Sequence, residues 1–199
     1  MKIQKTVLAQ KLNQIKGVVS KNTTMPILQG VLVKDGYLIA SNLEMTIRAK
    51  IPGTSEECFI IPERAFDLIN NLPEGMIDIS VSSENVMAIR ADKIRNTYQT
   101  VEPINFPILN IDGEGSEFTL KAEMLLKSIK SVSYAIPTQV TDMRMSSMCM
   151  QAKDGQLNFV GLDGHVLAWD KIKYDGEFEL LISKSTIEKL KSVLSTGDV

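Results

Sequence analysis

A repeated pattern of apolar and polar residues constrains the fold of this 199-residue chain more than any other feature. Residues 40–51 alternate between apolar and polar side chains around a short turn, and residues 161–172 repeat the pattern about 121 positions later. At the same offset, residues 59–72 and 180–193 each resemble a short strand that runs into a helix. Because alternation is typical of half-buried strands and a wider apolar spacing is typical of helices, we expect one module to occur twice.

Each copy also begins with a helix and a tight turn. The apolar stripes of these two helices are formed by Leu8, Leu12, Ile15 and Val19 and by Leu125, Ile129 and Val132. An Asp-Gly pair, which favours hairpin turns, follows at residues 35–36 and again at residues 154–155. The order helix, strands, helix therefore occurs twice, and it predicts an α+β fold in which antiparallel sheets carry two helices per domain on one face.

The two copies differ in length. The first copy continues through three more strand candidates and a loop with two prolines, at residues 77–81, 86–91, 97–101 and 102–107. The second copy has no counterpart to these segments within the sequence. We therefore expect a complete first domain at residues 1–113 and an incomplete second domain at residues 114–199, whose closing strands are missing.

Composition excludes several classes of protein. A net charge of −2 and a pI near 5.5 argue against a protein that coats nucleic acid through bulk positive charge. No apolar run approaches the roughly 18 residues that span a bilayer, and the N-terminus lacks a signal-peptide core, so we expect a cytoplasmic protein without membrane contact. Cys58 and Cys149 have no second ligand at metal-binding spacing, which predicts two buried unpaired side chains, no metal and no cofactor.

The charges are segregated along the chain. The four predicted helical segments, residues 5–21, 63–72, 121–134 and 183–195, hold eleven of the 22 basic residues but only four of the 24 acidic residues. These segments carry +7 and the remaining residues carry −9, so we expect a positive helical face and a negative opposite face. The helical spacing directs Lys127, Lys130 and Lys189 away from the core, where they either contact phosphates or are simply solvated.

Several short motifs, in this order, resemble those of the bacterial DNA sliding clamps, the beta subunits of the replicative DNA polymerase III. They lie at residues 24–28, 41–45, 71–75, 105–107 and 163–165. The resemblance covers the whole chain. It implies three similar domains per subunit, of which this chain holds the first and part of the second but not the third. It also implies that two subunits close head to tail into a ring with helices inside and sheets outside.

The resemblance implies a function in DNA replication. A clamp encircles double-stranded DNA without sequence preference and tethers the polymerase, which confers processivity. The positions that the resemblance and the helix charges assign to DNA are Lys5, Lys11, Lys16, Lys21, Asn22, Asn70, Lys127, Lys130, Thr141, Met145, Ser146, Lys184 and Lys189. Asn22 and Asn70 stand where such clamps often carry arginine, and Thr141, Met145 and Ser146 stand where they carry a glutamine and two tyrosines.

A second implied site is a hydrophobic cleft that captures short linear peptides of polymerases, the clamp loader and repair proteins. Its family sequence Thr-Asp-Gly-His-Arg-Leu corresponds here to residues 162–167. The residues that the resemblance assigns to this cleft are Arg144, Ser147, Leu162, Gly164, His165, Val166 and Leu167. Two of the six family positions are changed, to Leu162 and Val166, and both changes make the site more apolar.

The nearby methionines allow two interpretations. Alternation sends Met148 and Met150 to one face of a strand, where ordinary core packing is expected. The alternative places Met145 and Met148 on an adaptable peptide-binding surface.

An enzyme is not expected, because His165 is the only histidine and no nucleophile or phosphate-binding motif accompanies it. The chain is therefore predicted to be a non-catalytic processivity factor. A different class of binder remains as the alternative, namely a clamp-like adaptor that keeps the peptide cleft but does not encircle DNA. The asparagines at positions 22 and 70 favour the adaptor, whereas the lysine-bearing helices favour the clamp.

Overall fold

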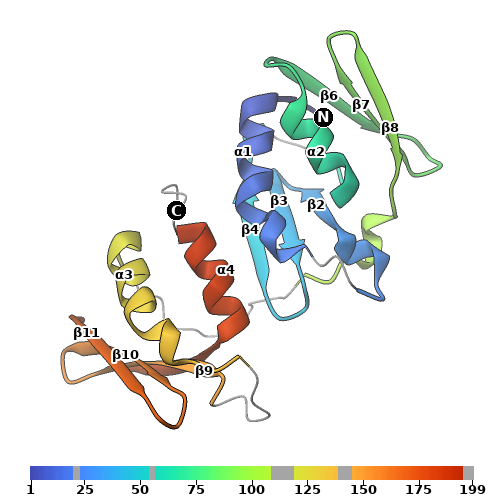
Figure 1. The fold of residues 1–199 in the computed structure, drawn as a ribbon. Coiled ribbons are helices and arrows are strands. Elements are labelled where there is room, and N and C mark those ends of the chain that lie inside the picture. The colour runs from blue at the N-terminus through green and yellow to red at the C-terminus, as the bar shows by residue number, and fades with distance from the viewer. Residues whose placement is uncertain (20–22, 54–56, 109–118, 139–144, 195–199) are drawn as a thin grey trace. The chain divides into compact units, whose positions relative to one another are not determined.

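The computed structural model describes residues 1–19, 23–53, 57–108, 119–138 and 145–194. The chain divides into two compact units, Met1–Asp112 and Gly113–Val199 (Figure 1). Each unit has its own hydrophobic core. No helix among the described residues is long and apolar enough to cross a membrane.

The first unit combines two four-stranded antiparallel sheets with two α-helices. Its strands are β1 (Lys2–Gln4), β2 (Gly30–Lys34), β3 (Tyr37–Ser41), β4 (Thr46–Lys50), β5 (Phe59–Pro62), β6 (Met76–Val81), β7 (Val86–Ala91) and β8 (Ile94–Gln99). Its helices are α1 (Lys5–Ile15) and α2 (Phe66–Asn71), with 3-10 turns η1 (Lys16–Val18), η2 (Pro26–Gln29), η3 (Glu63–Ala65) and η4 (Pro103–Asn105). The strand orders are β1-β6-β7-β8 and β4-β3-β2-β5.

The main core of the first unit lies between the two helices and the two sheets. Leu8, Leu12 and Ile15 of α1 are fully buried, as their spacing predicts, and Phe66 and Ile69 of α2 join them. Strands contribute alternate residues from both sheets to the same core cluster. The helices α1 and α2 pack against each other, so they form one layer over the sheets (Figure 1).

The β4-β3-β2-β5 sheet is also covered on the face turned away from the helices. There Leu28, Leu32, Ile39, Ile60 and Phe106 form a small separate core. The segment that follows β8 is tied to this face because Thr100 Oγ1 donates a 2.6 Å hydrogen bond to the Ile60 carbonyl. The first unit therefore buries both faces of this sheet.

The second unit repeats the architecture with one sheet. Its elements are α3 (Ala122–Val132), η5 (Ser133–Ala135), β9 (Ser147–Lys153), β10 (Gln156–Leu162), β11 (Leu167–Lys173), β12 (Phe178–Ser183) and α4 (Lys184–Leu194). The antiparallel order β11-β10-β9-β12 reproduces the order β4-β3-β2-β5 of the first unit. The predicted duplication and the predicted α+β architecture, an antiparallel sheet with two helices on one face, are thereby confirmed.

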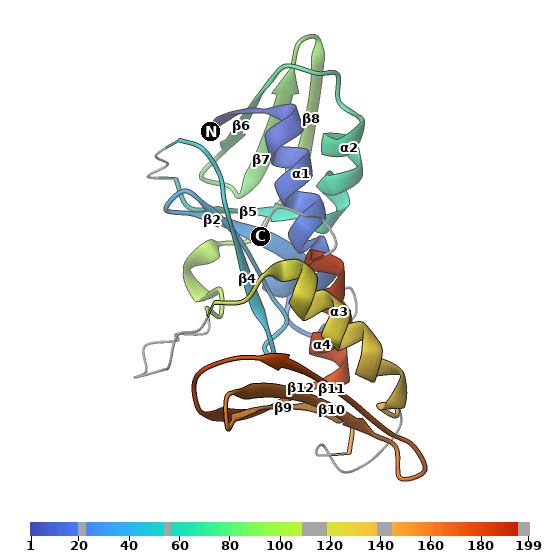
Figure 2. The same ribbon diagram turned by 90° about the vertical axis from the view of Figure 1, so that its left-hand side faces the viewer.

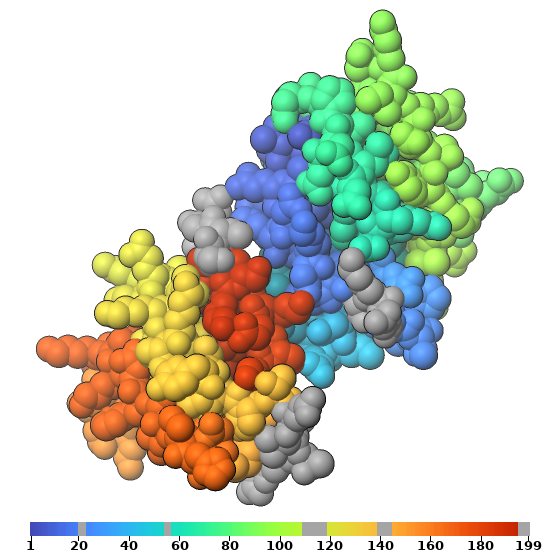
Figure 3. All heavy atoms as spheres, viewed as in Figure 1, coloured from blue at the N-terminus to red at the C-terminus, as the bar shows by residue number. Residues whose placement is uncertain are grey.

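The helices α3 and α4 lie side by side over one face of this sheet (Figures 2 and 3). Phe159, Ile129, Val132 and Ile187 are fully buried between the two layers. Met148 and Met150 are buried in the same cluster, which confirms the core interpretation of the methionines. Gly161 allows a close approach of α3, because a Cβ atom there would lie 2.5 Å from the Val132 carbonyl oxygen.

The predicted hairpin turns are confirmed by the backbone. Asp35 and Gly36 have φ of 51° and 76°, and Asp154 and Gly155 have φ of 53° and 75°, as a type I′ turn requires. The predicted strand at residues 97–101 instead spans Ile94–Gln99. Just beyond its end, the Thr100 N–H donates to the Asn85 carbonyl and the Thr100 hydroxyl donates to the Ile60 carbonyl. The short strand β1 is a feature that the sequence pattern did not indicate.

The predicted burial of the two cysteines is wrong for Cys58 and only partly correct for Cys149. Cys58 is exposed, since it precedes β5 and lies outside the alternating part of the strand. Cys149 is half-buried on β9, and burial raises the pKa of its thiol, with a further contribution from the Glu179 charge.

Candidate nucleic-acid interface and peptide site

The helix α3 presents a positive surface in the second unit. Lys127 and Lys130 are exposed, whereas Ser128, Ile129 and Val132 face the sheet and are buried. This division follows from the helical period, which places residues three or four apart on one face. The predicted outward direction of the two lysines is therefore confirmed.

A carboxylate on the sheet holds this helix in place. Asp170 of β11 faces α3, and Ser131 Oγ donates a 3.2 Å hydrogen bond to its Oδ2. Burial acts to raise the pKa of Asp170, but hydrogen bonds from Ser128, the Lys171 N–H and Ser131, and the charge of Lys127, outweigh burial and lower it. The sequence analysis did not identify Asp170 as a positioning residue, although its inward place in the alternating strand was a usable signal.

The lysines of α4 are less available than those of α3. Lys184 donates to the Ile136 carbonyl and, at 3.3 Å, to Thr138 Oγ1, so its ammonium group joins α4 to the preceding segment. Lys191 forms a 2.8 Å ion pair with Glu188 of the same helix. Lys189 is half-buried. Two of the three lysines of α4, Lys184 and Lys191, are therefore already engaged in contacts within the unit.

On the first unit the helix lysines also differ from one another. Lys16 is exposed at the end of α1 and Lys11 is half-buried. Lys5 lies 2.9 Å from Glu74, whose pKa is lowered by a hydrogen bond from Thr6 and then by Lys5. The Lys5 charge is thus paired within the unit.

The remaining predicted DNA positions fall into two groups. Asn70 is half-buried and accepts a 2.9 Å hydrogen bond from Asn13 Nδ2, which links α2 to α1. Met145 and Ser146 are half-buried just before β9, where the Ser146 carbonyl accepts a bond from the Lys184 N–H. The other predicted positions, Lys21, Asn22 and Thr141, together with Arg144 of the peptide site, lie outside the described residues.

The loop between β10 and β11 is closed by its own hydrogen bonds. Asp163 Oδ1 accepts bonds from the backbone N–H groups of His165 at 2.8 Å and Val166 at 2.7 Å. The Asp163 N–H donates back to the Val166 carbonyl, and Gly164 supplies the required φ of 89°. The bonds from Val166 and His165 lower the pKa of Asp163. His165 is exposed on this loop.

The same loop carries an apolar surface. Leu162, Val166 and Leu167 are exposed to 39%, 44% and 63%, respectively, which is unusual for three large apolar side chains in one turn. Ser147, the remaining predicted member, is buried on β9. The structure therefore brings Leu162, Gly164, His165, Val166 and Leu167 together at one end of the sheet.

An equivalent loop occurs in the first unit between β3 and β4. Asn42 Oδ1 accepts bonds from the N–H groups of Glu44 at 3.1 Å and Met45 at 2.8 Å, and the Asn42 N–H donates to the Met45 carbonyl. Leu43 takes the place of Gly164 with a positive φ of 74°. The duplication thus extends to the hydrogen-bonded geometry of a single turn.

The predicted negative face was wrong for the second unit. The strand positions that face away from α3 and α4 carry Lys153, Lys171 and Lys173 against one acid, Glu179. The other acidic residues of this sheet region lie mainly in its turns, at positions 154, 163, 175 and 177. The prediction summed the charges of all residues outside the helices. That sum combined the turns, where most of the acids lie, with the strands, where the lysines lie.

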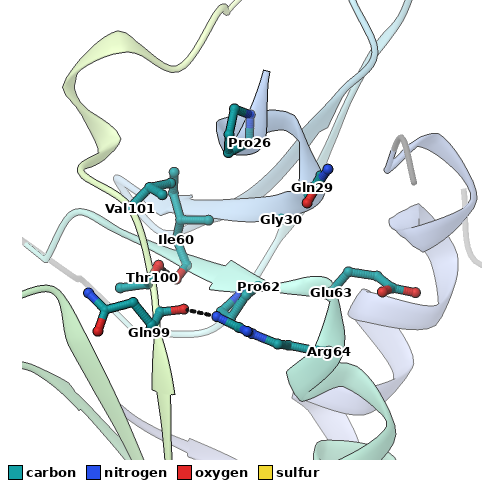
Figure 4. A pocket seen from close by; sticks show the side chains of 10 residues that line it. All are labelled: Pro26, Gln29, Gly30, Ile60, Pro62, Glu63, Arg64, Gln99, Thr100 and Val101. Carbon is teal, nitrogen blue, oxygen red and sulfur yellow. Dashed lines mark hydrogen bonds between the residues drawn. The ribbon is translucent and has the colours of Figure 1, made fainter. Parts of the chain in front are cut away.

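A groove of about 350 Å³ lies in the first unit where η2, β5 and the end of β8 meet (Figure 4). The Arg64 guanidinium spans it and donates a 2.7 Å hydrogen bond to the Gln99 carbonyl. The Thr100 hydroxyl also lines this groove, where it donates its hydrogen bond to the Ile60 carbonyl. No group of three or more potential metal ligands occurs among the described residues.

Comparison with known proteins is decisive for the family. The sequence profile of the DNA polymerase III beta subunit, N-terminal domain, matches residues 1–110, which is more than half of the chain. The chain belongs to the DNA polymerase III beta-subunit family. In this family, the beta sliding clamp of Halalkalibacterium halodurans is 24% identical over 217 residues, covering 98% of this chain and 57% of the relative.

Two further members of the family agree with this assignment. The beta sliding clamp of Salmonella typhimurium is 29% identical over 212 residues, covering 98% of this chain and 57% of the relative. The crystal structure of the DNA polymerase III subunit beta from Pseudomonas aeruginosa superposes with a TM-score of 0.88 at 25% identity, covering 100% of this chain and 57% of that one. The chain therefore spans somewhat more than half the length of these family members.

Proposed function

We propose that this chain acts in DNA replication as part of a sliding clamp, which encircles duplex DNA and tethers the polymerase and other clamp-binding proteins as a ring of two subunits. The observation that carries the proposal is the exposed charge on the helix layer, Lys16 in the first unit and Lys127 and Lys130 in the second. Membership of the beta-subunit family supports it.

Contact with DNA in this proposal is electrostatic and independent of sequence. Lysines that neutralise phosphates release counterions, so affinity falls steeply with salt while the protein stays free to slide. The duplex contacts are assigned to Lys16, Lys127 and Lys130, with Lys11 and Lys189 at the margin. Lys5 and Lys184 are assigned to holding the helices, because their ammonium groups already have partners.

Partner proteins dock, in the same proposal, at the loop of the second unit. Its exposed Leu162, Val166 and Leu167 present an apolar surface to a short linear peptide, and the hydrogen bonds of Asp163 hold that surface in shape. The chain works here without catalysis, through contact with DNA and with peptides. The adaptor alternative shares this peptide site and lacks only the DNA contact.

The experiment that tests the DNA contact reverses Lys127 and Lys130 to glutamate. Binding to a fluorescein-labelled duplex is measured by anisotropy over a salt series. We expect at least a roughly tenfold loss of affinity at low salt and a log–log salt slope smaller by about two. Both side chains are exposed, so thermal stability falls only by the small amount that the Lys127 charge contributes beside Asp170.

The matched control reverses Lys34 and Lys50, two exposed lysines on the sheet of the first unit. Their reversal changes the net charge by the same amount but removes no charge from the helix layer. Equal losses in both double variants would contradict the assignment of DNA to the helices. No loss in either variant would also contradict it and would favour the adaptor.

A further inference from the structure

The outer face of strands β10 and β11 is apolar where it adjoins the loop. Leu162 pairs with Leu167 across the two strands, and Val160 pairs with Trp169. Because paired residues of neighbouring strands share one face, these four side chains form a continuous square on the face turned away from the helices. Leu167 and Trp169 are 63% and 59% exposed.

The Trp169 ring is held in position. Its Nε1–H donates a 2.9 Å hydrogen bond to Asn158 Oδ1 on the neighbouring strand. The Lys171 ammonium lies 5.2 Å from the ring centroid, within the range of a cation–π contact. Trp169 is therefore a large, partly exposed aromatic side chain held in one orientation. Residues of this type often anchor binding interfaces.

The first unit shows that the fold itself does not require apolar residues here. The register Ser41 to Thr46 and Ile39 to Arg48 in the first unit matches Leu162 to Leu167 and Val160 to Trp169 in the second. The exposed β4 side chain at the Trp169 position is therefore Arg48, a charged residue. The small second core of the first unit lies over Ile39 and Ile60 rather than over β4, so it does not explain an apolar residue at this position.

Positive charge lies at the far end of the same face. Beyond Trp169 the outward positions are Lys171 and Lys173 on β11, and Lys153 lies on β9. All three side chains are exposed, and no ion pair involves them among the described residues. On the strands of this face the outward acid is Glu179 of β12, which accepts a 2.7 Å hydrogen bond from Gln151. The strand positions of this face are thus apolar at the loop and basic beyond Trp169, while the acids Asp154, Asp175 and Glu177 lie in the turns at the far end of the sheet.

We propose that the peptide site of the second unit extends from the 163–167 loop across β10 and β11 to Trp169 and ends at Lys171 and Lys173. Its partner is an extended peptide of another protein with apolar anchor residues followed by acidic residues. The inference rests on the proposed function only for the loop end of the site. Charge complementarity and continuity with the loop select this occupant over single-stranded nucleic acid, which needs several stacking aromatic side chains, whereas this face offers one.

Trp169 provides a direct test because it is the only tryptophan of the chain. Two synthetic peptides without tryptophan are compared, one with a leucine–phenylalanine pair followed by glutamates and one with glutamines in place of the glutamates. We expect a saturable blue shift of Trp169 emission with both peptides. We expect the glutamate peptide to bind about tenfold more tightly at low salt, a preference that disappears at high salt.

Two variants test separate parts of the site, and a third serves as the control. Binding of fluorescein-labelled peptides is followed by anisotropy. Reversal of Lys171 and Lys173 to glutamate removes the preference for the glutamate peptide, a loss of about tenfold or more for that peptide. Trp169→Arg, which installs the residue of the first unit, weakens both peptides about tenfold or more. Lys50→Glu, at the position of the first unit equivalent to Lys171, changes neither affinity and is the matched control.

Leu167→Asp separates failure of this inference from failure of the proposed function. If Leu167→Asp abolishes binding while Trp169 emission and the Trp169→Arg and lysine variants show no effect, the loop site stands and the extension is overturned. If no peptide binds at all, both are overturned. A Trp169 response to single-stranded DNA alone, or a blue shift that grows with protein concentration without peptide, would also overturn the proposal by identifying a different occupant.

Discussion

The two units have the same strand order, and each carries a pair of helices on one face of its own sheet. The opposite faces of these two equivalent sheets differ. In the first unit Leu28 and Phe106 cover Ile39 and Ile60, and β4 exposes charged residues. In the second unit Trp169 and Leu167 are exposed on the same architecture. Since both units keep the inward pattern, the comparison teaches that the buried alternation specifies the fold while the outward positions are free to diverge toward binding.

The largest expected effect concerns one residue on the second strand of the repeat. Gly161 lies under the Val132 carbonyl, whereas its counterpart is the fully buried Ala40. Gly161→Ala places a methyl group 2.5 Å from a backbone oxygen, so we expect a loss of about 1–3 kcal/mol that is confined to the second unit. Urea unfolding followed by Trp169 fluorescence measures it.

The reciprocal change sharpens this comparison. Ala40→Gly removes a buried methyl group and frees the unfolded backbone, for an expected cost of about 1 kcal/mol in the first unit alone. Native-state hydrogen exchange resolves the two units separately. A Gly161→Ala variant as stable as the native chain would show that α3 can move away from its sheet without penalty.

The turn before β4 differs from its counterpart in backbone strain. Leu43 has a positive φ of 74° where the second unit has Gly164. Leu43→Gly relieves a left-handed conformation that costs a leucine about 1–2 kcal/mol, partly offset by the entropy of glycine in the unfolded chain, so we expect a gain of about 0.5–1 kcal/mol. Thermal unfolding and hydrogen exchange of the first unit measure the gain.

Gly164→Ala is the converse variant. A Cβ atom at Gly164 meets nothing within 4 Å, so any loss there reports backbone conformation rather than collision. We expect a loss of about 1 kcal/mol in the second unit. Equal stability of both variants with the native chain would mean that the two turns tolerate the left-handed region without strain.

The smallest expected difference is a dependence on pH. Asp170 contacts α3, whereas the equivalent inward residue of the first unit is Ala49. The pKa of Asp170 is lowered in the folded state, so its ionised form stabilises the second unit. This stabilisation is fully present above the pKa of aspartate in the unfolded chain, about 3.9, and is lost as the pH falls through the lower pKa of the folded state. We expect Asp170→Asn to reduce the acid-induced fall in the thermal midpoint of the second unit.

The measurement is a series of melting curves followed by Trp169 fluorescence from about pH 7 to about pH 3. Asp175→Asn, which removes an exposed carboxylate outside the contact with α3, is the control. An unchanged acid response in Asp170→Asn would show that the hydrogen bonds from the helix do not depend on the charge of the carboxylate.

Much of the fold could be predicted from periodicity alone. The stripe of Leu8, Leu12 and Ile15 fixed α1, and the Asp-Gly pairs marked both hairpin turns, because local spacing and turn chemistry determine these features. Strand β1 escaped prediction since its three residues are too few to show alternation. The contact of Thr100 with Ile60, just beyond the end of β8, joins residues 40 positions apart in the sequence and was likewise not predicted.

The candidate site was predictable in its apolar part and less so in its charges. Leu162, Val166 and Leu167 gather where their motif suggested, because they surround one turn. The pairing of Lys5 with Glu74 and the contact of Lys184 with Ile136 join segments that are 69 and 48 residues apart. No spacing rule reveals such partners, so the sequence overstated how many helix lysines project freely.

The ring of hydrogen bonds around Asp163 has a consequence for the energetics of association. Since the Asp163 carboxylate and backbone already fix His165 and Val166, a ligand that docks against this turn does not need to immobilise it. The ordering cost on binding then falls almost wholly on the incoming chain. Differences in affinity among such ligands would reflect how stiff each one is before it arrives.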